Sequence, residues 1–216
     1  MGALFANIKV FIWDFDGTLY KPNPDLWKVV RESEYRVISD HTGWEKGRVV
    51  DEFSKLHKKV LPSATETVAS LCSITTAQAA VEMEKYYDRR TFLSRDERLI
   101  VLFSRLTIYR HFILANGVKK RIEEALDVLG ILPERFDAIV TSELVGENKP
   151  HDAGFRYILG KTNLPPDVHL MIGDREAIDL VPAQKLGMKT CLVWSDKKST
   201  FADVTMPSVY DVARLF

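Results

Sequence analysis

Short apolar runs alternate with segments whose apolar residues recur at helical spacing along most of this chain. The runs are rich in β-branched and aromatic residues and lack strict alternation with polar ones, which is typical of strands covered on both faces. Because strands that alternate with helices favour a parallel sheet between two helical layers, we expect an α/β fold with a doubly wound, Rossmann-like parallel sheet. The expected strands are residues 8–13, 109–114, 138–140, 168–172 and 189–193.

Helices are predicted between these strands, and a glycine follows three of them. One apolar stripe runs from Val118 through Ile122 to Leu129, as expected when one face of a helix packs on a sheet. Glycine is favoured just after a helix because it adopts the left-handed backbone conformation at little cost. We expect the three helices to end before Gly130, Gly160 and Gly187.

The stretch from residue 20 to about residue 91 has no convincing strand pattern and repeats apolar residues at helical spacing. Thr75-Thr76-Ala77-Gln78 resembles a capping box that opens a helix continuing through Tyr87. About 70 residues are enough for a small domain. We interpret residues 20–91 as an all-helical cap inserted directly after the first strand, and residues 1–19 with 92–216 as the α/β core.

Composition narrows the class of protein. Hydrophobic residues make up 46% of the chain, and 30 Lys and Arg balance 30 Asp and Glu, which argues against a nucleic acid or an acidic membrane as partner. Lys9 and Asp14 interrupt the N-terminal apolar stretch, so we expect no signal peptide and no membrane span. Cys72 and Cys191 match no metal-ligand spacing and are interpreted as free thiols in a reducing compartment. These features predict a cytoplasmic protein and leave its oligomeric state open.

The candidate chemistry begins where the first predicted strand ends, at Asp14 and Asp16. One buried carboxylate is costly, and two nearby like charges cost more unless a cation or a proton intervenes. A divalent metal ion is therefore the first candidate ligand. A carboxylate left free to attack would make the site catalytic.

Further polar groups follow later predicted strands. They are Asn116-Gly117, Lys149-Pro150 and Gly173-Asp174, with Asp179 further on. Loops at the carboxyl ends of parallel strands converge on one crevice of an open sheet. We therefore expect a cluster of acids, one lysine and one asparagine at a single site.

Each of these residues has an ordinary interpretation when taken alone. The first two aspartates could cap a turn, and Lys149 could be a solvated loop residue. Asp174 and Asn116 could cap helices, and Asp179 could lie in a first helical turn for electrostatic reasons. Their order along the chain, each near the end of a predicted strand, favours the functional interpretation.

Together the residues resemble the haloacid dehalogenase superfamily, specifically its phosphatases with a helical cap after the first strand. Asp14-Phe15-Asp16-Gly17-Thr18 is similar to the family's first motif, Lys149 to its lysine motif, and Gly173-Asp174 with Asp179 to its acidic motif. The stretch 136–150 also resembles the nucleotidase-like members. The resemblance covers essentially the whole chain.

The resemblance implies Mg²⁺-dependent hydrolysis of a small phosphorylated metabolite, such as a sugar phosphate or a nucleoside monophosphate. Asp14 would be the nucleophile that forms an aspartyl-phosphate. Asp16 would protonate the leaving alkoxide and then activate water. Lys149 would offset negative charge beside the nucleophile, and the backbone amide of Asn116 would help to bind the phosphoryl group.

The same resemblance implies the ligands of the metal ion. Mg²⁺ would be held by the Asp14 carboxylate, the backbone carbonyl of Asp16 and the Asp174 carboxylate, with waters completing an octahedron. Asp179 would act on the metal directly or through a water molecule.

One position departs from the family pattern, and three alternatives stay open. The family normally has Ser or Thr just before Asn116, where this chain has Ala115. A phosphomutase uses the same motifs but shields the aspartyl-phosphate from water. A carbon–halogen hydrolase of the same fold is disfavoured because it needs neither Asp16 as an acid nor a metal at Asp174. The missing hydroxyl suggests the third alternative, a degenerate binding or regulatory member.

The Ala115→Thr variant is expected to release phosphate faster, because its hydroxyl would add a hydrogen bond to the phosphoryl group. Loss of a comparable transition-state donor costs roughly 3 kcal/mol elsewhere. Turnover of a phosphomonoester by the two proteins, measured side by side, checks this. An unchanged or lower rate would show that the methyl group suits the site.

Overall fold

The computed structural model describes residues 2–21, 23–59 and 63–216. Its centre is a parallel sheet with the strand order β3-β2-β1-β4-β5-β6. The expected doubly wound α/β fold is confirmed. The strands are β1 (Val10–Trp13), β2 (Arg110–Leu114), β3 (Ala138–Val140), β4 (His169–Gly173), β5 (Lys189–Leu192) and β6 (Val204–Thr205).

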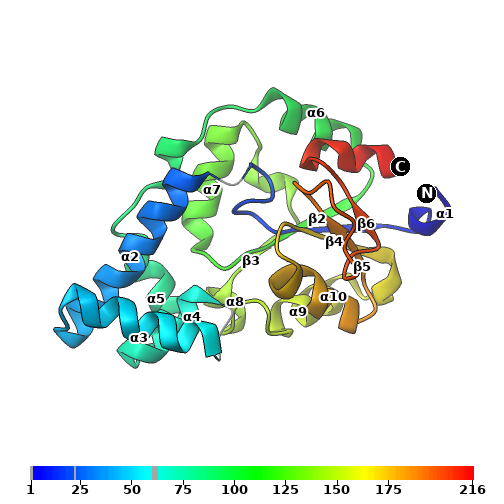
Figure 1. Ribbon diagram of the computed structural model, residues 1–216. Helices are drawn as coiled ribbons and strands as arrows, with labels where there is room; N and C mark the ends of the chain where they lie inside the picture. The colour runs from blue at the N-terminus through cyan, green and yellow to red at the C-terminus, as the bar shows by residue number, and fades with distance from the viewer. Residues whose placement is uncertain (1, 22, 60–62) are drawn as a thin grey trace.

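Helices cover both faces of this sheet (Figure 1). Successive side chains of a strand point to opposite faces, so Phe11 and Trp13 of β1 enter one apolar cluster while Val10 and Ile12 enter the other. The helices of this part are α1 (Gly2–Phe5), α6 (Glu97–Arg105), α7 (Lys119–Leu129), α8 (Ser142–Val145), α9 (Ala153–Thr162) and α10 (Val181–Lys185). Short helical turns are Arg89–Phe92, Pro133–Arg135, Pro166–Val168, Glu176–Leu180 and Val209–Leu215.

Further helices form a lobe beside the sheet, drawn in blue to cyan in Figure 1. They are α2 (Pro24–Thr42), α3 (Lys46–Lys59), α4 (Ala64–Cys72) and α5 (Thr76–Met83). This lobe has an apolar cluster of its own, which includes Ile38 of α2, Phe53 of α3, Val68 of α4 and Met83 of α5. The elements assigned between residues 20 and 91 are helical, as the sequence pattern predicts.

Several predicted element ends were wrong. The helix expected to stop before Gly160 continues through it to Thr162 and ends at Asn163, whose φ of 52° is left-handed. Phe155 and Ile158 are fully buried, and their packing offsets the cost of about 1 kcal/mol for a glycine inside a helix. The capping box at Thr75 does open α5, but this helix ends at Met83 rather than continuing through Tyr87.

Other local predictions were accurate. Helix α7 ends at Leu129, and Gly130 follows it with a φ of 82°.

The sequence pattern missed β6, because its two residues are too few to form an apolar run.

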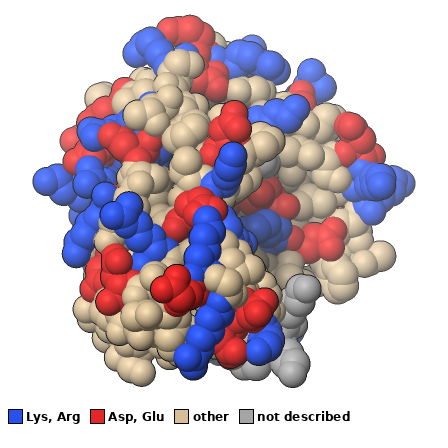
Figure 2. Space-filling model, turned by 60° about the vertical axis from the view of Figure 1, so that its left-hand side comes forward, with Lys and Arg blue, Asp and Glu red and all other residues tan. Residues whose placement is uncertain are grey.

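Charged groups of both signs are interspersed on the face shown in Figure 2. This distribution agrees with the equal numbers of basic and acidic residues in the chain. Within residues 2–21, 23–59 and 63–216, every helix is too short or too polar to cross a membrane.

Candidate active site

Two neighbouring strands bring acidic residues together at the carboxyl edge of the sheet. β1 and β4 pair directly, with Trp13 opposite Ile172. The Asp14 N–H extends this ladder by donating to the Ile172 carbonyl over 2.9 Å. Asp14 follows β1, and Asp174 follows β4. The strands β2 and β3 lie on one side of this pair, and β5 and β6 lie on the other. Open α/β sheets bind ligands at such a switch point.

Lys149 enters the site from the loop between α8 and α9. Its Nζ donates to Asp14 Oδ1 over 2.7 Å and to Asp179 Oδ1 over 2.6 Å, and all three side chains are buried. Burial by itself would lower the pKa of Lys149, but attraction to the two carboxylates raises this pKa above its ordinary value. The lysine is therefore charged at neutral pH.

Asp14 is held on both of its oxygens. The Thr18 hydroxyl donates to Oδ2 over 2.7 Å, while Lys149 occupies Oδ1. Burial alone would raise the pKa of Asp14, but attraction to Lys149 and Arg175 brings this pKa below its ordinary value. Asp14 is therefore an ionised carboxylate at neutral pH, which is the form that a nucleophile needs.

Asp174 has fewer donors around it. Its Oδ1 is buried and makes no hydrogen bond within the described residues, and the Arg175 Nε lies 3.9 Å away. Burial, followed by repulsion from Asp14 and Asp179, raises the pKa of Asp174 to about 7. Gly17 permits the close approach of this carboxylate, because a Cβ there would lie 2.7 Å from Asp174 Oδ2.

Asp14, Asp174 and Asp179 form the candidate metal centre. One carboxylate oxygen of each lies within 4.8 Å of the corresponding oxygens of the other two. These three acids face two basic groups, Lys149 and Arg175, so negative charge is in excess. Oxygen ligands, excess negative charge and a buried Asp174 oxygen that makes no hydrogen bond within the described residues fit a hard divalent cation such as Mg²⁺.

The Asn116 side chain holds the loop that carries the lysine. Its Nδ2 donates to the Lys149 carbonyl over 2.8 Å, and its Oδ1 accepts from the Lys149 N–H over 2.8 Å. Both hydrogen bonds join the end of β2 to the backbone of one residue in a distant loop. Asn116 therefore positions Lys149, and phosphoryl binding by its backbone amide stays a prediction.

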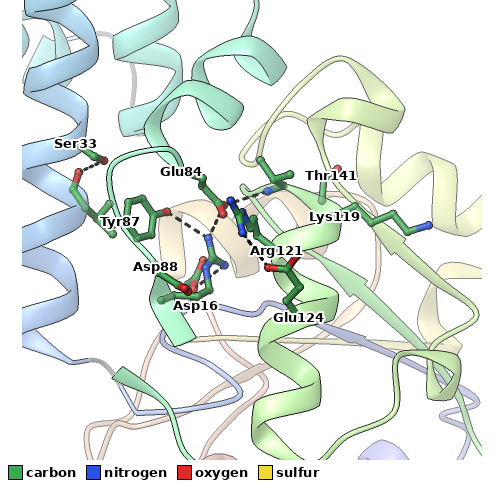
Figure 3. Close-up of polar contacts among 12 residues, drawn as sticks. Asp16, Ser33, Glu84, Tyr87, Asp88, Lys119, Arg121, Glu124 and Thr141 are labelled. Carbon is green, nitrogen blue, oxygen red and sulfur yellow. Dashed lines mark hydrogen bonds and ion pairs between the residues drawn. The ribbon is translucent and has the colours of Figure 1, made fainter. Parts of the chain in front are cut away.

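The Asp16 carboxylate points to different partners from those of the other acids. Arg89 Nη1 donates to Asp16 Oδ1 over 3.1 Å and to Oδ2 over 3.0 Å, and the Tyr20 hydroxyl donates to Oδ1. The same guanidinium donates through Nη2 to Glu84 Oε1 over 2.5 Å and to the Tyr87 hydroxyl over 3.3 Å (Figure 3). Asp16 is thus tied to the segment that joins the helical lobe to the core.

A cavity of about 90 Å³ lies between the sheet edge and the helical lobe. Asp14, Asp16, Asn116 and Arg175 line it from the core side. Residues of α2, α5 and the start of α4 line it from the other side. The volume is well below the roughly 300–1,000 Å³ that is usual for drug-sized ligands, so it suits a small ligand.

The model of the haloacid dehalogenase-like hydrolase family matches residues 8–187 of this sequence. A glyceraldehyde 3-phosphate phosphatase from Methanothermobacter thermautotrophicus is 30% identical over 205 residues, which cover 88% of this chain and 87% of that protein. This chain belongs to the haloacid dehalogenase-like hydrolases. The family and the hydrolase class predicted from the sequence are confirmed.

Two further relatives show how far the similarity extends. A glyceraldehyde 3-phosphate phosphatase from Methanocaldococcus jannaschii is 35% identical over 91 residues, and this match covers 42% of the chain and 40% of that protein. The crystal structure of a phosphatase of this family from Thermococcus onnurineus superposes with a TM-score of 0.68 at 21% identity, covering 96% of this chain and 97% of that one. The second likeness shows a shared fold.

The site brings together the residues predicted from the sequence. The side chain of Asp16, however, has different partners from those of the other acids, which the sequence did not indicate. Asp14, Lys149, Asp174 and Asp179 lie together, and Asn116 lies against the lysine loop. Within the described residues, Asp16 is the only one of the predicted acids whose side chain accepts hydrogen bonds from Arg89.

Sequence reasoning missed the two arginines of the site, Arg89 and Arg175, and the tyrosine beside Asp16. Arg175 directly follows Asp174, so its position was a usable signal. Arg89 has no local signal, because its partners Asp16 and Glu84 come from separate parts of the chain. Tyr20 reaches Asp16 from four residues further along the chain.

Ala115 is 3% exposed, and its N–H donates to the Val140 carbonyl over 3.0 Å. This residue therefore continues the pairing of β2 with β3 immediately before Asn116. The effect of its missing hydroxyl on turnover stays a prediction.

The Asn116→Ala variant is expected to lower the free energy of unfolding by about 1–3 kcal/mol, because the Lys149 N–H and carbonyl lose their partners. Denaturant unfolding measures this change. Gln184→Ala, which shortens an exposed side chain of α10, is the control and should stay within about 0.5 kcal/mol of the wild type. Identical unfolding curves for the Asn116 variant and the wild type would contradict the role of this side chain.

Proposed function

We propose that this protein hydrolyses small phosphomonoesters in a Mg²⁺-dependent reaction through an aspartyl-phosphate at Asp14. The observation that carries the proposal is the buried pair of Asp14 with Lys149, set beside Asp174, whose buried Oδ1 makes no hydrogen bond within the described residues. An ionised, buried carboxylate at a ligand-binding edge is suited to nucleophilic attack. The relatives named as glyceraldehyde 3-phosphate phosphatases support a small phosphorylated metabolite as substrate.

In the first proposed step, an Asp14 carboxylate oxygen attacks phosphorus and the bond from phosphorus to the leaving oxygen breaks. The proton that the leaving alkoxide needs comes from Asp16. Lys149 holds the anionic nucleophile in place beside an anionic substrate and offsets charge as the transition state forms. In the second step, Asp16 takes a proton from water, which attacks phosphorus and releases phosphate from Asp14.

Asp16 can serve both steps only if its carboxylate is held within reach of the leaving oxygen. We propose that Arg89 and Tyr20 provide this positioning. Asp16 and Asp14 both line the cavity, whereas Arg89 lies behind Asp16 and does not line it. Arg89 and Tyr20 are therefore positioning residues rather than catalytic residues.

The carboxylates of Asp14, Asp174 and Asp179, with the backbone carbonyl of Asp16, are the groups we propose to hold Mg²⁺. When bound, the ion would offset the negative charge of the phosphoryl oxygens and of the acids around them. Burial and repulsion from Asp14 and Asp179 raise the pKa of Asp174, and a bound cation would oppose this effect.

We propose that residues 20–91 act as a cap over a core formed by residues 1–19 and 92–216. Helices α2, α4 and α5 line the cavity opposite the acids, and they are placed to exclude water and to contact the leaving group. A phosphomutase would use the same residues but shield the aspartyl-phosphate from water. Release of inorganic phosphate distinguishes the two.

The wild-type protein is expected to release phosphate from phosphomonoesters only with Mg²⁺, and Asp14→Asn should reduce this activity on the order of 10³-fold or more because the nucleophile is lost. Mg²⁺ should also raise the melting temperature of the wild type but not that of Asp174→Asn. The control is Asp167→Asn, which alters an exposed acid at the amino end of β4. Phosphate release in the presence of a chelator, or full activity of Asp14→Asn, would contradict the mechanism.

Tyr20→Phe and Arg89→Lys are expected to lower kcat by roughly tenfold to a hundredfold with little change in KM, because each weakens a hydrogen bond to the Asp16 carboxylate. Steady-state kinetics on one phosphomonoester separate the two constants. Tyr109→Phe, at the amino end of β2, is the matched control. A rise in KM at unchanged kcat would show that the two side chains contact the substrate instead of positioning Asp16.

A further inference from the structure

One face of α2 is turned toward the candidate active site. Trp27, Val30 and Glu34 are spaced by three and four residues, so they lie on the same side of the helix. All three line the cavity that also contains Asp14 and Asp16. The helical lobe thus presents two large apolar side chains and one carboxylate to the reacting groups.

Glu34 is an unusual residue for this position. It is 3% exposed, and its Oε2 makes no hydrogen bond of acceptable geometry within the described residues. Arg31 Nη1 lies 2.7 Å from this oxygen, but the two groups are poorly aligned, and the side chain of Arg31 is 39% exposed. Burial raises the pKa of Glu34 to about 7 despite the attraction of Arg31.

The fold does not require a carboxylate here. Leu26, Val37 and Ile38 of the same helix supply buried apolar packing. A buried polar oxygen without a hydrogen bond is costly, and the cost disappears when a donor binds to it. The ion pair with Arg31 offsets part of this cost, and a hydroxyl of a ligand in the cavity would supply an aligned hydrogen-bond donor.

The space next to Glu34 can accept the carbon part of a small substrate. The residues that line a second cavity of about 260 Å³ include Trp27, Val30, Arg31 and Glu34 on the lobe side and Asp174 and Arg175 on the core side. Glu34 lines both cavities. A phosphoryl group placed at Asp14 would direct its leaving group toward this carboxylate.

We propose that Glu34 selects the leaving group by accepting a hydrogen bond from a hydroxyl on it and by disfavouring leaving groups with a second anionic group. This inference rests on the phosphomonoester hydrolysis proposed above and names its substrate class, small hydroxylated phosphomonoesters. A site built to bind a hydroxyl discriminates strongly against the analogue without it, because its buried acceptor is left unpaired. A second carboxylate or phosphate placed against Glu34 would meet a like charge. Arg31 and Arg175 line the same cavity, so Glu34→Gln tests whether this repulsion outweighs their attraction.

The test compares three substrates with small leaving groups. Propyl phosphate and glycerol 1-phosphate share a three-carbon leaving group and differ in its hydroxyls, and 2-phosphoglycolate carries a carboxylate. The wild type is expected to show a kcat/KM for glycerol 1-phosphate at least about tenfold above that for either of the others. Phosphate release with Mg²⁺ gives these constants.

Two substitutions separate the hydrogen bond from the charge. Glu34→Met removes the acceptor and should bring the kcat/KM values for glycerol 1-phosphate and propyl phosphate to within about threefold of each other. Glu34→Gln removes the charge and should raise kcat/KM for 2-phosphoglycolate about tenfold or more. The matched control is Glu32→Gln, because Glu32 lies on the same helix, 53% exposed and paired with Lys46. It should leave every ratio unchanged.

Melting curves establish whether the variants are folded. If Glu34→Met does not fold, the kcat/KM of Glu34→Gln for 2-phosphoglycolate decides whether Glu34 has the proposed role. Substrate ratios that match the wild type in both folded variants would overturn the role of Glu34 and leave the phosphatase activity standing. A wild type that releases no phosphate from any of the three substrates would overturn the proposed function, and this inference with it.

Discussion

The ion-paired cluster of Lys149 with Asp14 and Asp179 is the interaction on which the rest of the site depends. These carboxylates lie almost without solvent contact at the edge of the sheet, and a buried charge without a partner is strongly unfavourable. Removing one member of such a pair typically costs about 3–5 kcal/mol, because the other charge stays buried. The lysine must therefore be delivered to one place, and the two hydrogen bonds from Asn116 to its backbone hold the loop that delivers it.

The acids of the site are divided by their partners. Asp14 and Asp179 share the lysine, and Asp174 lies beside them with a buried Oδ1 that accepts no hydrogen bond from the described residues. Asp16 is two residues from Asp14 but is bound by Arg89 and Tyr20. Two carboxylates so close in sequence can take different chemical roles because their surroundings differ.

Fold alone does not determine the reaction, because one architecture hosts many chemistries and the activity resides in the groups placed on it. In this protein the core supplies Asp14, Asp16 and Arg175 to the cavity, and the helical lobe supplies the opposite wall, which includes Glu34. Arg89 links these two parts, since it follows α5 in the chain and binds both Asp16 and Glu84. The position of the Asp16 carboxylate therefore depends, through Arg89, on the position of the lobe.

Local sequence determined most of the sheet, the helix that ends before Gly130, and the positions of Asp14 and Asp174 directly after strands. Apolar periodicity, turn chemistry and the convergence of loops at one sheet edge are short-range rules that a single chain displays. The tertiary structure decided the passage of α9 through Gly160, the partners of Asp16 and the burial of Glu34. Arg89 meets Asp16 across a separation of 73 residues, and no local pattern encodes such a contact. Burial and pairing of this kind depend on which surfaces pack together, and only the folded chain defines those surfaces.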